Sequence, residues 1–97
     1  MNLKKILLKA ADKIDKFGWI RGAYGNELIG YCIGEAIHAS GGRRDLIGER
    51  DLDTIRLALG FRNRWELPKW NDQPERTKEQ VIERLQLAAS LLGPHNE

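Results

Sequence analysis

The sequence predicts an all-α fold: a small single helical domain over residues 1–97, with its ordered part at about 3–93. Two segments, 3–17 and 77–92, carry apolar residues at the three- and four-residue steps of an amphipathic helix. Hydrophobic residues make up 41% of the chain and charged residues 31%, as in soluble globular proteins. We expect three or four helices, a Gly-rich loop or short hairpin after the first, and an aromatic-rich loop before the last.

The first expected helix, 3–17, has one apolar face and one lysine face. The apolar face is formed by Leu3, Leu7, Ala10, Ile14 and Phe17. Such a helix suits a membrane surface or an acidic partner, but Asp12 and Asp15 dilute the positive face. We therefore favour a core helix with solvated lysines that stops at Gly18. No apolar run approaches the ~20 residues that span a bilayer, so no membrane partner is expected.

Glycines punctuate residues 18–31, and helical spacing resumes over 29–39. The stretch 24–27 has the composition of a turn. Trp19 and Tyr24, beside these glycines, either pack on the core or line a recognition surface. In the second expected helix, the buried face is predicted to contain Ile29, Cys32, Ile33, Ala36 and Ile37. Cys32 is thus interpreted as a small buried hydrophobe.

Residues 43–64 form an arginine-rich middle with a short expected helix at 51–59, which ends before Gly60. Candidate phosphate contacts are Arg43, Arg44, Arg50, Arg62 and Arg64. Acidic residues interleave with these arginines, which favours a solvated face laced with ion pairs. Binding of phosphate, of nucleic acid or of an acidic protein remains open.

Residues 61–76 are expected to form a long connection, packed down by Trp65 and Trp70. Asp72 and Arg76 could form an ion pair that braces this turn, or they could meet a ligand. The last helix then opens at Thr77, because Thr77 and Gln80 have the spacing of a capping box. Gly93-Pro94 is expected to close it.

The residue types argue against catalysis and against a bound cofactor. The chain has one cysteine and two histidines, and it lacks the glycine-rich phosphate loops and the Cys/His spacings of metal sites. We therefore predict no catalytic residue, no metal, no cofactor and no enzymatic activity. A small enzyme or small-ligand binder that uses acids such as Asp72 would need a deep pocket beside Asp72 and Arg76.

The block from Trp70-Asn71-Asp72 through Arg76-Thr77 to Val81 resembles the signature of an uncharacterised small domain family of actinobacteria and their phages. Further similarity lies in the Leu-x-x-Ala-Ala-Asp stretch at 7–12, in Gly18-Trp19 and in the segment 32–37. The resemblance covers roughly residues 7–90, and its middle, 41–66, matches poorly. It implies a small cytoplasmic protein, in the host cytoplasm if phage-encoded, and no known activity.

The sequence therefore favours a non-enzymatic protein that binds a partner protein of the host cell. The residues predicted to bind it are Trp19, Tyr24, Trp65, Trp70, Asp72 and Arg76. The alternative is a nucleic-acid-binding protein that uses the arginine-rich middle, and homo-oligomer formation is left open. Every residue of the 70–77 block also has a sufficient structural role as a turn or a helix cap.

Overall fold

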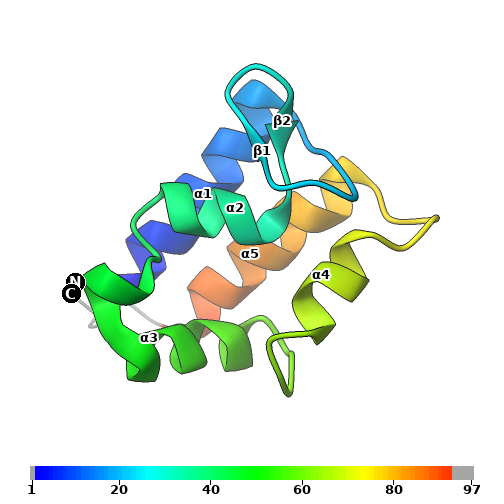
Figure 1. Ribbon diagram of the computed structural model, residues 1–97. Helices are drawn as coiled ribbons and strands as arrows, with labels where there is room; N and C mark the ends of the chain where they lie inside the picture. Colours follow the sequence, from blue (N-terminus) through cyan, green and yellow to red (C-terminus); the bar gives the residue numbers. More distant parts are fainter. Residues whose placement is uncertain (1, 93–97) are drawn as a thin grey trace.

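The computed structural model describes residues 2–92, in which five helices and one small hairpin follow one another along the chain (Figure 1). In order they are α1 (Leu3–Phe17), β1 (Gly25–Asn26), β2 (Gly30–Tyr31), α2 (Ile33–Ala39), α3 (Arg44–Ala58), α4 (Glu66–Asn71) and α5 (Lys78–Leu92). The fold is mostly helical, as predicted, but it is not strictly all-α, because the short hairpin forms instead of a Gly-rich loop. The predicted number of three or four helices is wrong, because α4 was not foreseen.

The core lies between α1 and α5, which run side by side through the molecule (Figure 1). Leu7 and Ile14 of α1 and Val81 and Leu85 of α5 are completely buried. Each such side chain contributes about 1.5–3 kcal/mol through burial. α2 packs on α1 and α3 packs on α5, so these helices cover the pair. Within residues 2–92, no helix is both long and apolar enough to cross a membrane.

Helices α1 and α5 begin as their sequences predict. The Asn2 side chain accepts a hydrogen bond from the Lys5 amide (3.1 Å), which starts α1 at the predicted residue. At α5 the predicted capping box is confirmed: the Thr77 hydroxyl accepts from the Gln80 amide (3.2 Å), and the Gln80 side chain accepts from the Thr77 amide (3.1 Å). The predicted stop at Gly93-Pro94 lies outside the described residues.

The hairpin displaces the predicted start of the second helix. β1 and β2 pair antiparallel, with Gly25 opposite Tyr31 and Asn26 opposite Gly30. The turn of the hairpin comprises residues 27–29, which lies later in the chain than the predicted turn at 24–27. Ile29 lies in the turn and is exposed instead of buried. Gly30 has φ +96°, which a continuous right-handed helix does not allow, so α2 begins only at Ile33.

The middle of the chain is more helical than predicted. α3 begins at Arg44 instead of residue 51 and bends at Gly48, whose φ is +82°. α4 occupies part of the expected connection 61–76. Pro68 is its third residue, where a backbone N–H has no partner within the helix, so proline does not disrupt it. The Asn63 side chain accepts hydrogen bonds from the amides of Trp65 and Glu66 and so caps the start of α4.

The hairpin's close approach to the loop after α1 predicts an unequal tolerance of two glycines. A Cβ on Gly30 would lie 2.8 Å from the Gly18 carbonyl carbon, whereas a Cβ on Gly22 would meet nothing within 4 Å. Both have positive φ, so Gly22→Ala should lower the free energy of unfolding by about 1–2 kcal/mol. Gly30→Ala should cost about 1–3 kcal/mol more, because backbone must also move. Urea unfolding of both variants checks this, and equal losses would contradict it.

Candidate functional site

The predicted site residues fall into two groups in space. Trp19, Trp70, Asp72 and Arg76 lie where α4 and the turn after it meet the loop that follows α1. Trp65 lies with three of the predicted arginines around an apolar pocket. Tyr24, in the loop that leads into the hairpin, is 79% exposed and lies beside the first group, because it lines the same cavity as Asn71 and Asp72. Each group can therefore be assigned a role from its own contacts.

Asn71 is the centre of the first group, and its burial was not predicted from the sequence. It is 1% exposed. Its Oδ1 accepts from the Trp19 indole Nε1 (2.8 Å) and from the Ile33 amide (3.0 Å), and its Nδ2 donates to the Ile20 carbonyl (3.2 Å) and to Asp72 (2.9 Å). The amide thus uses its full bonding capacity. The signal was its place one turn after Leu67, on the inward side of α4.

Trp70 and Arg76 brace the turn after α4. The Arg76 guanidinium lies 3.9 Å from the centre of the Trp70 ring, and its Nε donates to the Trp70 carbonyl (2.9 Å). Arg84 lies on the same ring at 4.7 Å, and the Phe61 ring packs against it at 5.9 Å. Trp70 is half-buried. Both residues therefore have structural partners that account for their presence.

The predicted ion pair between Asp72 and Arg76 is wrong. Asp72 instead accepts hydrogen bonds from the Gly22 amide (2.9 Å) and from Asn71. These two donors, and the nearby Arg21, hold the pKa of the Asp72 carboxyl below its ordinary value of 3.8. Asp72 therefore holds the turn after α4 against the loop after α1. It braces the turn, as one of the two predictions had it, but through the Gly22 amide instead of Arg76.

A cavity of about 480 Å³ does lie beside Asp72, and it also reaches Cys32 and His38. Cys32 does not face the core as predicted. It is half-buried at the N-cap of α2, where its Sγ accepts from the Glu35 amide (3.3 Å). Burial raises the pKa of its thiol. Cys32 and His38 share no hydrogen bond, and His38 lies 3.7 Å from Glu35. His95 is outside the described residues.

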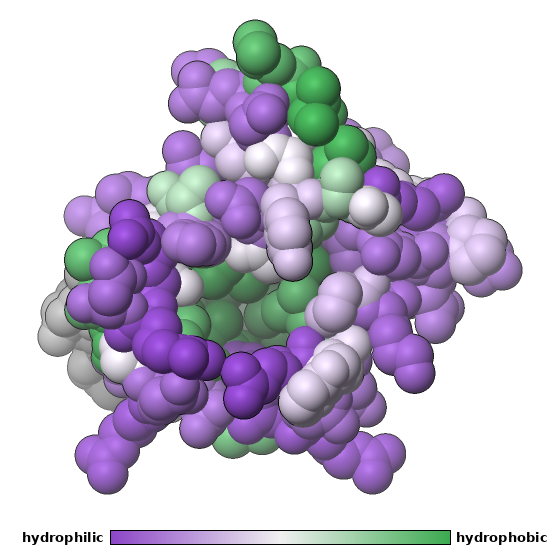
Figure 2. Space-filling view, viewed as in Figure 1, coloured by the Kyte–Doolittle hydropathy of each residue, from purple (hydrophilic) through white to green (hydrophobic). Residues whose placement is uncertain are grey.

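The second group surrounds a pocket of about 430 Å³ between α2, α3 and the segment that leads into α4. Figure 2 shows it as a hollow with an apolar floor and a polar rim. Ile37, Leu52, Ile55 and Leu67 supply apolar lining, and Trp65 stands at the edge with 67% of its surface exposed. A cavity with an apolar interior and a few polar groups is typical of a binding site.

The rim of this pocket, which we call the arginine rim, consists of Arg44, Arg56, Arg62 and Arg64. Arg44 is paired with Glu49 (2.7 Å) and Arg56 with Asp53 (3.3 Å). Arg56 also donates to the carbonyls of residues 61 and 62, so it holds that segment on α3.

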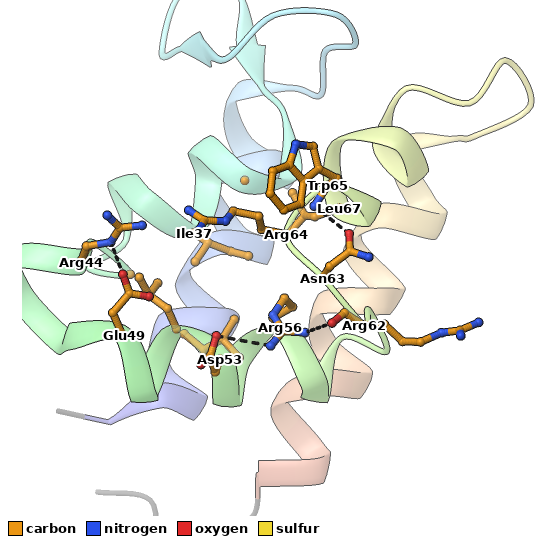
Figure 3. A pocket seen from close by; sticks show the side chains of 14 residues that line it. Ile37, Arg44, Glu49, Asp53, Arg56, Arg62, Asn63, Arg64, Trp65 and Leu67 are labelled. Carbon is orange, nitrogen blue, oxygen red and sulfur yellow. Dashed lines mark hydrogen bonds and ion pairs between the residues drawn. The ribbon is translucent and has the colours of Figure 1, made fainter.

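In two arginines of the rim, Arg62 and Arg64, the guanidinium pairs with no carboxylate of residues 2–92, although the Arg62 backbone amide donates to the Glu66 carboxylate. Arg62 points away from the cavity, whereas Arg64 reaches over it toward α2 (Figure 3). The Arg64 guanidinium lies 5.4 Å from the centre of the Trp65 ring. Arg64 is therefore the guanidinium that an incoming anion would find at the pocket.

The other predicted arginines stand apart from this pocket. Arg43 is paired with Asp45 (2.8 Å). Arg50 is exposed and is not part of the pocket wall. Because Arg62 also points away, these arginines do not form one continuous face toward a ligand. Within residues 2–92, no group of three or more His, Cys, Asp or Glu side chains could hold a metal ion.

Fold and pocket together define a small helical protein with one buried polar cluster and a surface pocket of ligand size. The chain belongs to a family of unknown function (DUF6197), whose family model matches residues 1–91. This match includes the middle segment 41–66, in which the resemblance noted from the sequence was poor. No curated protein and no solved structure matches the chain. The family describes no activity, so function has to be argued from the pocket.

The hydrogen bonds of Asn71 predict a large loss of stability on truncation. Asn71→Ala leaves the Trp19 N–H, the Ile33 N–H and the Ile20 carbonyl without their partner. We expect the free energy of unfolding to fall by about 3–5 kcal/mol, since each unsatisfied buried group costs about 1–3 kcal/mol. Asn63→Ala is the matched control, because Asn63 is exposed and should cost about 1 kcal/mol or less. If urea unfolding shows that the two variants lose comparable free energy of unfolding, Asn71 is not the central polar contact of this group.

The lowered pKa of Asp72 predicts how stability changes with acid. A carboxyl whose folded pKa is depressed stabilises the protein above the unfolded pKa, and this contribution disappears as the pH falls through the folded pKa. NMR titration of the Asp72 carboxyl should therefore give a midpoint below 3.8. The Asp72→Asn variant should lose less stability than the wild type on acidification below about pH 4. A midpoint at or above 3.8 would refute the assigned hydrogen bonds.

Proposed function

We propose that this protein is a non-enzymatic module that binds a protein partner in the cytoplasm, and that the pocket receives a segment of that partner. The observation that carries the proposal is the combination of an exposed Trp65 and an unpaired Arg64 at the mouth of an apolar cavity. The partner segment is one that carries an apolar side chain next to a carboxylate. A host-cell protein, with this chain encoded by a phage, remains the prediction from the resemblance.

The aromatic and apolar walls support an apolar anchor in the partner. Trp65 is largely exposed at the edge of the pocket. Ile37, Leu52 and Leu67 form the floor of the cavity, on which a single aliphatic or aromatic side chain can pack. Tryptophan and arginine dominate the energetically important positions of protein interfaces. The side chain that enters is removed from water on several sides, as the anchors of interfaces usually are.

The positive charge of the rim supports a carboxylate in the partner segment, next to its apolar anchor residue. Glu49 and Asp53 each already pair with an arginine, so a new carboxylate meets no free acid on the rim. Arg64 can donate two parallel hydrogen bonds to such a carboxylate. The ring of Trp65 keeps the guanidinium in place before binding, which lowers the entropy that the contact costs.

The contacts of the reactive side chains support a binding protein over an enzyme. Cys32 serves as a helix cap with a raised thiol pKa, so its nucleophilic form is disfavoured at neutral pH. Asp72 holds a backbone amide, and the two acids of the arginine rim are bound to arginines. None of these groups is left poised for general acid or base chemistry.

Nucleic-acid binding is the alternative, and the arrangement of the arginines favours it less. Arg43 and Arg44 are each bound to an acid, and Arg62 and Arg64 point in different directions (Figure 3). A phosphate backbone is recognised by several cations along one surface, and its binding weakens steeply with salt. A peptide held by Trp65 and one arginine should depend on salt only weakly.

The proposal predicts what a random peptide library will yield. Peptides selected on the wild-type protein alone should combine an aliphatic or aromatic residue with an adjacent Asp or Glu. For the best peptide, Trp65→Ala should weaken binding about 30-fold or more, the effect of losing an interface hot spot. Arg64→Glu should weaken it about tenfold or more, because the carboxylate then meets a like charge. Isothermal titration calorimetry measures both.

Arg50→Glu is the matched control, since it makes the same charge change on α3 away from the pocket, and it should alter affinity less than about twofold. Circular dichroism shows that each variant is folded. The peptide proposal fails if no acidic-apolar motif emerges, or if the selected peptides bind Trp65→Ala as well as wild type. Salt-sensitive binding of a labelled oligonucleotide in place of peptides would establish the alternative.

A further inference from the structure

The end of the hairpin is the most exposed apolar feature of the described chain. We call residues Glu27, Leu28 and Ile29 the hairpin tip. Leu28 is 92% exposed and Ile29 is 57% exposed. Figure 2 shows the apolar surface of this region as a projection from one end of the molecule. Single exposed apolar residues are ordinary, but two neighbours at the end of a projection form a surface that gains free energy when it is covered.

The hairpin tip is held in one shape by the chain itself. The Asn26 side chain accepts hydrogen bonds from the amides of both Leu28 (2.8 Å) and Ile29 (3.2 Å), which fixes the turn. At its base, the Tyr31 amide donates to the Gly18 carbonyl (2.9 Å). The apolar side chains are therefore presented on a preorganised loop, which reduces the entropy lost when a partner covers them.

The chemistry of the hairpin tip matches the chemistry of the pocket. Glu27 supplies a carboxylate that forms no ion pair within residues 2–92, and Leu28 and Ile29 supply the adjacent apolar side chains. This is the combination that Arg64, Trp65 and the apolar floor suit. In Figure 2 the tip projects away from the hollow, so a rigid hairpin cannot reach the pocket of its own chain.

We propose that the hairpin tip of one copy docks in the pocket of a second copy, with Leu28 in the apolar floor and Glu27 facing Arg64. This inference rests on the pocket that the proposed function uses. The two surfaces differ, so the contact is heterologous and continues into rings or open chains. A hairpin tip covers far less area than a stable dimer interface, so self-association should be weak and should compete with binding of the partner.

Sedimentation velocity from about 10 µM to about 1 mM tests the proposal, a range suited to a weak contact. The weight-average mass of the wild type should rise with concentration. Leu28→Asp and Arg64→Glu should each remain monomeric over this range. Leu87→Asp is the control, because it makes the same substitution at another exposed leucine, 57% exposed on α5, and it should associate as the wild type does.

Mixing the two monomeric variants identifies the geometry. Leu28→Asp keeps an intact pocket and Arg64→Glu keeps an intact tip, so an equimolar mixture should form a complex of two copies and nothing larger. If Arg64→Glu alone associates like the wild type, the tips pair with each other and the proposal is overturned. If Leu28→Asp alone associates like the wild type, the tip is not the contact and the proposal is likewise overturned.

The outcome separates this inference from the proposed function. A wild type that stays monomeric at 1 mM yet binds acidic-apolar peptides through Trp65 overturns self-docking and leaves the peptide pocket standing. A wild type that neither associates nor binds such peptides overturns both. Where both hold, a selected peptide should dissociate the self-associated protein, because the peptide and the hairpin tip occupy the same pocket.

Discussion

The structure depends on the buried amide of Asn71 more than on any other polar contact. It joins three segments that are distant in sequence: the loop after α1 through Trp19 and Ile20, the start of α2 through Ile33, and α4 itself. A satisfied buried amide adds little net free energy, but an arrangement that leaves its partners unpaired is costly. Asn71 therefore acts mainly by excluding other packings of α4.

The position of α4 in turn decides where the pocket forms. This six-residue helix carries Asn71 at its end, and Leu67 near its beginning forms part of the pocket wall beside Trp65. The apolar core between α1 and α5 gives the molecule its stability, but it would accept α4 in other positions, since hydrophobic contact is not directional. Polar bonds in one place thus fix the shape of a binding surface in another.

The sequence predicted the parts of the fold that rest on local rules. The helix 3–17 and the capping box at Thr77 follow from spacing and caps, and both are as expected. α4 was missed because six residues hold too little periodicity and Pro68 suggested a loop. The hairpin was left as an alternative because its strands have two residues each. Trp65 and Arg64 were named as candidates, but the pocket that unites them joins residues 34 to 67, which no local pattern encodes.

The bend at Gly48 is spanned by an ion pair of the arginine rim. Arg44 precedes the bend and Glu49 follows it, so their ion pair ties together the two straight parts of α3. Both side chains are more than half exposed, so the tie is weak. A carboxylate that reaches Arg44 competes with Glu49 for the same guanidinium and loosens the tie. The bend itself is set by the backbone of Gly48, so a carboxylate bound at Arg44 would change only how firmly the two parts of α3 are held together.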